Sequence, residues 1–228
     1  MKAKAKAKPA APERREESLS RDHIVATAIE LLDAEDEDGL TFRALATRLQ
    51  TGAGALYWHI KNKDELLVAA SEAIVDRAMA NVGCHATPKQ TLHGIALGVF
   101  ETIDAHPWVG AQLVRNPAPT ATLKIFERIG RQVQALGAPA HTQFTAATVL
   151  GSYIISESRQ NAANGRLRQP HPSRTEFLEQ AAEQWQQLDA AEFSFTRSAA
   201  QRLREHDDRA EFLAGVDLIL AGIAASST

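Results

Sequence analysis

Residues 41–63, TFRALATRLQTGAGALYWHIKNK, contain the pattern that decides the fold of this chain. Thr41 is a candidate N-cap for a helix over residues 42–49, because its hydroxyl can accept a hydrogen bond from the first helical turn. Residues 50–51 then turn the chain, and a second helix is expected to run to about Ile60. Two short helices joined by a tight turn are typical of a helix-turn-helix, whose second helix enters the major groove of DNA.

The segments outside this motif also have helical patterns, and none has a convincing strand pattern. A first helix is expected after Ser20, ending at the acidic run 35–38 and Gly39, and a fourth is expected after Asn62. The fold class expected is therefore all-α, with an N-terminal three-helix helix-turn-helix domain and a larger helical domain. Further helices are expected from Thr87 to about Asp104, over 108–114, 123–136 and 141–163, from Ser173 through Trp185, and after Asp208.

Composition limits the class of protein. The chain has 228 residues, 44% of them hydrophobic, and a formal net charge of −3, so any binding to nucleic acid must rely on a local basic surface. No apolar run approaches the roughly 20 residues needed to span a bilayer. The single cysteine, Cys84, cannot form an internal disulfide and has no metal-binding cluster around it, so a reducing cytoplasm is expected. No cofactor or metal is expected.

The lysine-rich start, MKAKAKAKPAAPERREES, lacks apolar periodicity and is expected to be a disordered arm. It has no apolar stretch behind it and is not read as a secretory signal. It either keeps the protein soluble or touches DNA phosphates. The expected division of the chain is a basic arm over 1–19, a helix-turn-helix domain over 20–66 and a helical domain over 67–228.

The segments LTFRALATRLQ and LYWHIKNKDELL closely resemble the tetracycline-repressor (TetR) family of bacterial regulators, and AEFLAGVDLILAGI resembles the final dimerising helix of its tetracycline-repressor branch. The resemblance implies a homodimer that binds double-stranded operator DNA and holds a small-molecule inducer in the core of its larger domain. It also implies that the ligand shifts the fourth helix and releases the operator. The second domain is therefore expected to bind ligand and to dimerise.

The residues expected to face DNA lie around the two-helix motif. Arg43 is the candidate for a bidentate contact to guanine, and Thr41 and Lys63 suit phosphate contacts. Tyr57 and Trp58 have packing between domains as an alternative role. Where the tetracycline repressors carry polar base-reading side chains, this chain has only glycine and alanine, which either allow close approach to thymine methyl groups or leave recognition to DNA shape. The full set is Thr41, Arg43, Thr51, Ala53, Ala55, Tyr57, Trp58, His59 and Lys63.

The candidate ligand residues are aromatic and polar side chains of the larger domain, which suit an apolar pocket with a few polar groups. They are Phe100, His106, Trp108, Gln112, Arg115, Phe126, Tyr153, Glu157 and Trp185. In the tetracycline repressors a histidine after the fifth helix helps to hold magnesium. Leu113 or Val114 stands near that place here, which argues against a metal–tetracycline complex.

The residues expected at the dimer interface are small side chains on the long helix and an apolar stripe on the last helix. They are Gly151, Ile155, Phe212, Val216, Ile219, Leu220 and Ile223. The stripe has an alternative role as core within a single chain.

Two other functional classes remain open. An enzyme would need converging nucleophiles, bases or metal ligands, and the histidines are scattered while Cys84 has only His85 beside it, so no catalytic residues are expected. A helical small-molecule-binding or adaptor protein with a degenerate DNA-binding domain is the other alternative, which the glycine- and alanine-rich motif keeps in view.

Overall fold

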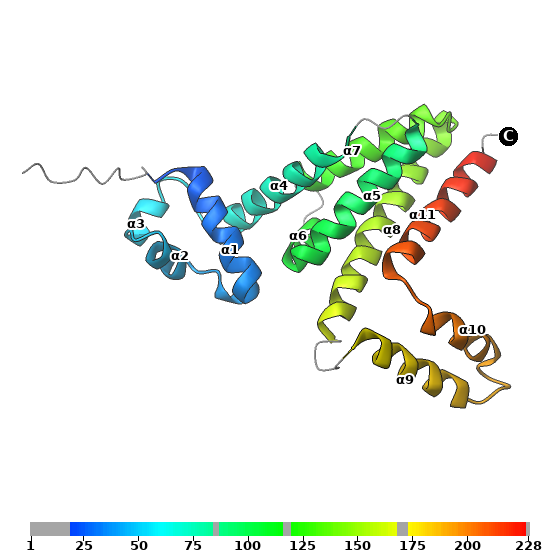
Figure 1. The fold of residues 1–228 in the computed structure, drawn as a ribbon. Helices are drawn as coiled ribbons and strands as arrows, with labels where there is room; N and C mark the ends of the chain where they lie inside the picture. Colours follow the sequence, from blue (N-terminus) through cyan, green and yellow to red (C-terminus); the bar gives the residue numbers. More distant parts are fainter. Residues whose placement is uncertain (1–18, 84–86, 116–119, 168–172, 227–228) are drawn as a thin grey trace, which may run out of the picture.

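The fold is all-α, as expected. The computed structural model describes residues 19–83, 87–115, 120–167 and 173–226, which form eleven helices and no strand. Residues 1–18 of the basic arm expected over 1–19 therefore lie outside the described residues, and so does Cys84. Figure 1 shows a small N-terminal helical group, a central bundle and a separate pair of helices that precedes the last helix in the sequence.

The N-terminal group contains α1 (Arg21–Gly39), α2 (Phe42–Arg48) and α3 (Ala53–Leu56). The predicted caps are confirmed, because the Ser20 hydroxyl accepts a hydrogen bond from the amide of His23 and the Thr41 hydroxyl accepts one from Ala44, at 3.2 and 3.0 Å. The three helices enclose an apolar seam that fixes their mutual orientation. Its members Ile24, Leu31, Leu45, Leu56 and Ile60 are buried, and Leu49 is half-buried at its edge.

The turn between α2 and α3 is a Schellman motif. Gln50 adopts a left-handed backbone with φ of 51°. Its amide donates to the carbonyl of Thr47 and the amide of Thr51 donates to that of Ala46, at 3.2 and 2.9 Å. These bonds satisfy carbonyls that the end of α2 leaves free. The helix that follows is shorter than predicted: α3 ends at Leu56, and residues 57–59 continue as turns.

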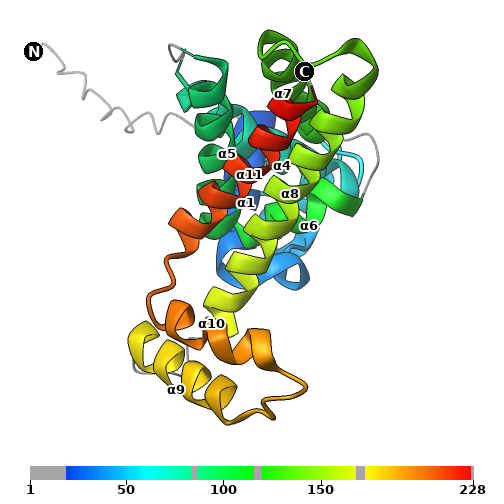
Figure 2. The same ribbon diagram turned by 90° about the vertical axis from the view of Figure 1, so that its right-hand side faces the viewer.

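The central bundle is built from α4 (Lys63–Asn81), α5 (Pro88–Ala105), α6 (Pro107–Arg115), α7 (Thr120–Ala135), α8 (Ala140–Leu167) and α11 (Asp208–Ala225). Asn62 and Thr87 cap α4 and α5 as predicted. Helix α4 packs against α1 at one end and against α5, α6 and α7 along its length, so it connects the N-terminal group to the bundle (Figures 1 and 2).

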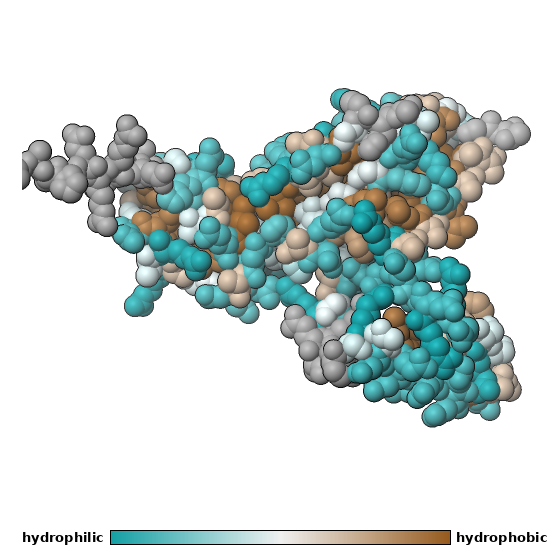
Figure 3. Space-filling view, in the orientation of Figure 1, coloured by the Kyte–Doolittle hydropathy of each residue, from teal (hydrophilic) through white to brown (hydrophobic). Residues whose placement is uncertain are grey.

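The C-terminal part departs from the sequence prediction. Ser173 caps α9 (Arg174–Gln187) as expected, but a further helix, α10 (Ser194–Arg204), was not predicted. Helices α9 and α10 pack mainly on each other and stand apart from the bundle in Figures 1 and 2, and the face of this pair seen in Figure 3 is mostly hydrophilic. The N-cap of α11 is Asp207 and not Asp208. Helix α8 also extends beyond the predicted 141–163.

Candidate functional site

The face made by α2, α3 and the turns after α3 carries most of the residues predicted to meet DNA. Arg43, Tyr57 and Trp58 are exposed there, Tyr57 to 57% and Trp58 to 90%. The ring of Phe42 stacks on Tyr57 with centroids 4.6 Å apart, which holds the phenol at the edge of the face. The exposed side chains of Arg43 and Tyr57 are of types that can donate hydrogen bonds to a nucleic-acid backbone. Of the remaining predicted residues, Thr41 and Ala53 are exposed and Thr51, Ala55 and His59 are half-buried.

The side chain of Lys63, predicted to contact a DNA phosphate, binds the end of α1 in this structure. It is half-buried, and its ammonium donates a hydrogen bond to the backbone carbonyl of Glu37. That carbonyl lies at the end of α1, just after the kink at Asp36, whose φ is 57°, and it also accepts a hydrogen bond from the amide of Leu40 at 3.3 Å. Lys61, two residues earlier, has an exposed side chain and is the better placed cation beside this face.

Gly52 and Gly54 lie at the start of α3. A Cβ atom built at either position would meet no atom within 4 Å, and neither residue has a positive φ. The free protein therefore gives no steric or conformational reason for glycine at these two positions. Glycine instead lowers the intrinsic stability of a helix by about 1 kcal/mol relative to alanine. The space in front of these backbones is open to an incoming partner.

A polar junction joins α1 to α6. One carboxylate oxygen of Asp33 accepts hydrogen bonds from Nδ1 of His106 and from Nε1 of Trp108, each at 2.7 Å. Trp108 is almost fully buried, so its indole nitrogen needs a partner inside the protein. The α1 carboxylate supplies that partner and fixes the start of α6 against the N-terminal group.

The same junction continues one helical turn further along both helices. Glu37 accepts from the amide of Gln112 and, with both oxygens, from Nη1 of Arg115 at 2.7 Å. Arg166 of α8 binds the neighbouring Asp36 at 3.0 Å. The acidic run at the end of α1 is therefore matched by partners from two helices of the bundle. We call this set, Asp33, Asp36, Glu37, His106, Trp108, Gln112, Arg115 and Arg166, the domain junction.

Four of the predicted ligand residues lie at the domain junction. His106, Trp108, Gln112 and Arg115 bind α1 and do not line the main cavity. Their polar groups find partners on α1, which lie about 75 residues earlier in the chain.

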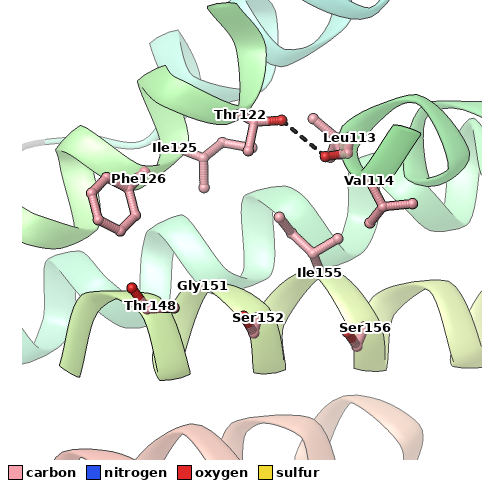
Figure 4. Close-up of a pocket in the computed structure, with 10 residues that line it drawn as sticks. All are labelled: Leu113, Val114, Thr122, Ile125, Phe126, Thr148, Gly151, Ser152, Ile155 and Ser156. Atoms are coloured by element: carbon pink, nitrogen blue, oxygen red, sulfur yellow. Dashed lines mark hydrogen bonds between the residues drawn. The ribbon is translucent and has the colours of Figure 1, made fainter. Parts of the chain in front are cut away.

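The main cavity lies between α6, α7 and α8 and has a volume of about 320 Å³. Figure 4 shows its apolar wall and a row of hydroxyl groups along α8. The hydroxyl of Thr122 is already engaged, since it donates to the carbonyl of Leu113 at 3.1 Å. Among the described residues no charged side chain lines the cavity, which suits an apolar ligand held by a few hydrogen bonds. The lining residues are Leu113, Val114, Thr122, Ile125, Phe126, Thr148, Gly151, Ser152, Ile155 and Ser156.

The remaining predicted ligand residues are divided between this cavity and other places. Phe126 lines the cavity. Phe100 and Tyr153 instead pack on Phe212 of α11, with ring centroids 4.7 and 5.8 Å apart. Burial, followed by the charges of Glu157 and Glu211, raises the pKa of Tyr153. Glu157 itself is exposed, and Trp185 lies on α9, outside the bundle core.

The predicted dimer residues mostly belong to the core of a single chain. Phe212, Val216, Leu220 and Ile223 are buried against the bundle, and Ile219 is half-buried. Gly151 and Ile155 line the cavity. Within one chain the stripe therefore lies against the bundle, in the position that its alternative role as core requires. The exposed side of α11 carries Leu218, which is 76% exposed.

The described residues hold neither a candidate metal site nor a candidate membrane-spanning helix. Among residues 19–83, 87–115, 120–167 and 173–226, no three histidine, cysteine, aspartate or glutamate side chains are grouped so that they could hold a metal ion. In the same ranges no helix combines the length and apolar character that crossing a bilayer requires.

Known proteins share this arrangement. SCO7222, a TetR transcriptional regulator from Streptomyces coelicolor, is 46% identical, and its structure superimposes with a TM-score of 0.83 over 92% of this chain and all of that one. ActR from the same organism, solved with actinorhodin, shares the fold at 23% identity and a TM-score of 0.76, over 92% of this chain and 97% of its own.

A curated relative, an HTH-type transcriptional regulator from Saccharopolyspora erythraea, is 29% identical over 138 residues, which are 60% of this chain and 58% of the relative. Residues 24–70 match the family of bacterial regulatory proteins called tetR, and residues 87–227 match the tetracyclin repressor-like C-terminal domain. The second match alone covers more than half of the chain. The chain therefore belongs to the tetR family of bacterial regulatory proteins, in the branch that has a tetracyclin repressor-like C-terminal domain.

Proposed function

We propose that this protein works in the cytoplasm as a ligand-responsive transcriptional repressor, which binds a palindromic operator as a homodimer and leaves it when a small molecule enters the cavity. One observation carries this proposal. Helix α6 supplies Leu113 and Val114 to the cavity and, from the adjacent positions, Gln112 and Arg115 to the domain junction. A ligand that displaces α6 must therefore disturb the contacts that hold α1.

A second route leads from the cavity to α4. Helix α7 lines the cavity through Ile125 and Phe126 and is bound to α4 on its other side. Lys124 binds both carboxylate oxygens of Asp76 at 2.6 and 2.7 Å, and Arg128 donates to the carbonyl of Met79 at 2.7 Å. Because α4 begins directly after the DNA-facing motif, motion of α7 would shift that motif. The two routes give a ligand a mechanical connection to both ends of the N-terminal group.

The dimer is proposed to form through the outward sides of α8 and α11. Phe144 and Val149 on α8 and Leu218 on α11 are exposed apolar side chains, and Ala214 and Ala221 beside Leu218 would allow close approach of a second helix. Two helices from each chain would then form a four-helix interface. A two-fold dimer of this kind can place its two α3 helices about 34–36 Å apart, one turn of DNA.

The test is binding to DNA from upstream of the protein's own gene, measured by fluorescence anisotropy over a range of salt concentrations. Specific binding with a steep salt dependence is expected. Arg43→Ala should weaken specific binding by about 1–3 kcal/mol and relax sequence preference at one position. Equal binding of the unmodified protein to every duplex would contradict the role of Arg43. No binding to any duplex would favour the alternative of a helical small-molecule-binding protein with a degenerate DNA-binding domain.

A further inference from the structure

A second cavity lies beside the first and contains Arg159, which has no carboxylate partner among the described residues. This groove has a volume of about 460 Å³ and runs between α6 and the later part of α8. We call it the Arg159 groove; its lining residues are Pro107, Ala111, Ser156, Arg159, Gln160, Ala162, Ala163 and Arg166. Ser156 lines both this groove and the main cavity, so the two spaces adjoin along α8.

Arg159 is held in place by its stem. A Cβ atom at Gly110 of α6 would come within 2.6 Å of Cγ of Arg159 and 3.1 Å of a methyl group of Ile103. Only glycine at position 110 allows the aliphatic part of Arg159 to lie across α6 so closely. An arginine positioned in this way buries its stem and leaves its guanidinium free to meet solvent or a ligand.

The guanidinium of Arg159 makes no ion pair or hydrogen bond within the described part of the chain, and its side chain is exposed. The other arginine of the groove differs, because Arg166 binds Asp36 of the domain junction at 3.0 Å. The groove thus places one uncommitted cation next to another that holds α1. An anion bound to the first would also attract the second.

The two cavities have complementary chemistry. The main cavity has an apolar wall and, along α8, the hydroxyl groups of Thr148, Ser152 and Ser156 at four-residue spacing, which puts them on one side of the helix (Figure 4). It suits the uncharged, apolar body of a ligand. The Arg159 groove begins where that row of hydroxyls ends and suits a planar anion such as a carboxylate, which arginine can bind through two parallel hydrogen bonds.

We propose that the ligand of this regulator is an amphipathic acid, whose apolar body fills the main cavity while its carboxylate, or a comparable anion, binds Arg159. This inference rests on the proposed function and specifies the ligand class of that same site. The anion would also compete with Asp36 for Arg166 and so loosen the domain junction. The charge of the ligand therefore contributes to the response as well as to affinity.

The test uses two- and three-ring aromatic carboxylic acids, such as anthraquinone-2-carboxylic acid, each paired with its primary amide. Binding to the full-length protein is measured by calorimetry. At least one acid is expected to bind about tenfold or more tightly than its amide, because the amide keeps the shape and loses the charge. In Arg159→Met, which keeps the length of the stem, the ratio should fall to near one. Arg131→Met, a surface change on α7, should leave the ratio unaltered.

Three outcomes overturn the proposal. The first is that no acid binds more tightly than its amide. The second is that the preference persists in Arg159→Met. The third is that Arg159→Met changes the molar mass in solution, which would make Arg159 part of a contact between two copies. Operator binding by the ligand-free protein is measured in parallel, so the proposed function can stand while the ligand class fails.

Discussion

Nη1 of Arg115, on α6, lies 2.7 Å from each carboxylate oxygen of Glu37, on α1. The residue before Arg115 in the chain, Val114, lines the main cavity. A single turn of helix therefore touches both the space for a ligand and the helix that supports the DNA-facing motif. We therefore expect the domain junction to transmit a movement of α6 at the cavity to α1 in the N-terminal group.

The ion pair between Glu37 and Arg115 is expected to stabilise the fold measurably. Its carboxylate is only 23% exposed and is shared with Gln112, so a double-mutant cycle with Glu37→Gln and Arg115→Met should give a coupling of about 1 kcal/mol. The measurement is thermal unfolding, in which 1 kcal/mol corresponds to about 2–4 °C for a chain of this size.

The control cycle uses Arg131 and Glu127, an exposed pair one turn apart on α7. Such pairs contribute about 0.3–0.5 kcal/mol. If the junction pair couples no more strongly than this control, Glu37 and Arg115 do not hold the domains together.

Gly54→Ala should separate stability from DNA binding. The new methyl group has no steric conflict in the free protein, and the helix gains up to about 1 kcal/mol. Operator affinity should fall, because the methyl group would occupy space that we assign to the approaching duplex. The control is Gly130→Ala on α7, which is equally unobstructed. Operator affinity that is unchanged in Gly54→Ala would argue against close approach at this position.

The two lysines of the motif should behave differently. Lys61→Met is expected to weaken binding to all DNA sequences alike and to reduce the salt slope by about one, as loss of one phosphate contact does. Lys63→Met should mainly lower the melting temperature, since its ammonium binds the end of α1. Salt titrations of operator affinity compare the variants. A reduced salt slope in Lys63→Met, with stability intact, would restore Lys63 as the phosphate ligand.

Acid should weaken the attachment of α11 to α5. Asp217 accepts hydrogen bonds from Lys89 at 2.7 Å and His93 at 2.9 Å, and these, Lys89 first, lower its pKa. A carboxyl group whose pKa is lower in the folded than in the unfolded state stabilises the fold at pH values above its unfolded pKa of about 3.9. This stabilisation is lost as the pH falls through the pKa of the folded state. Asp217→Asn should therefore melt lower than the unmodified protein near pH 7, and the difference should shrink as the pH falls through the lowered pKa of Asp217. A difference that is independent of pH would exclude this origin.

The local features of the fold could be read from the sequence. Ser20, Thr41, Asn62, Thr87 and Ser173 all cap helices where predicted, because an N-cap depends only on residues within one turn. Helix α10 was missed for the same reason. It begins at Ser194, its N-cap residue Phe193 makes no side-chain cap hydrogen bond, and its segment has few apolar residues.

The candidate site was harder to predict, because its contacts join distant segments. Nothing near His106 in the sequence indicates that Asp33 will bind it, and the cavity wall comes from three helices. One signal was available. The acidic run over 35–38 lies at the end of α1, where carboxylates oppose the helix dipole, so it needed cations from elsewhere in the fold. Likewise, an apolar stripe such as that of α11 does not reveal whether it faces its own core or a second chain.

The central claim is that filling the main cavity changes how the DNA-facing motif binds its operator. A substitution at Gly151 tests this claim without knowledge of the ligand. Gly151 lines the cavity on α8 (Figure 4). A Cβ atom at this position would make an ordinary 3.6 Å contact with Ile129. Gly151→Leu would place a permanent side chain in the space of the ligand, while Gly151→Ala serves as the control. We predict that operator affinity, measured by anisotropy on folded dimers, falls about 5-fold to 150-fold in Gly151→Leu, the range of a coupling of about 1–3 kcal/mol, and stays near normal in Gly151→Ala. Equal operator affinity in the two variants would contradict the account.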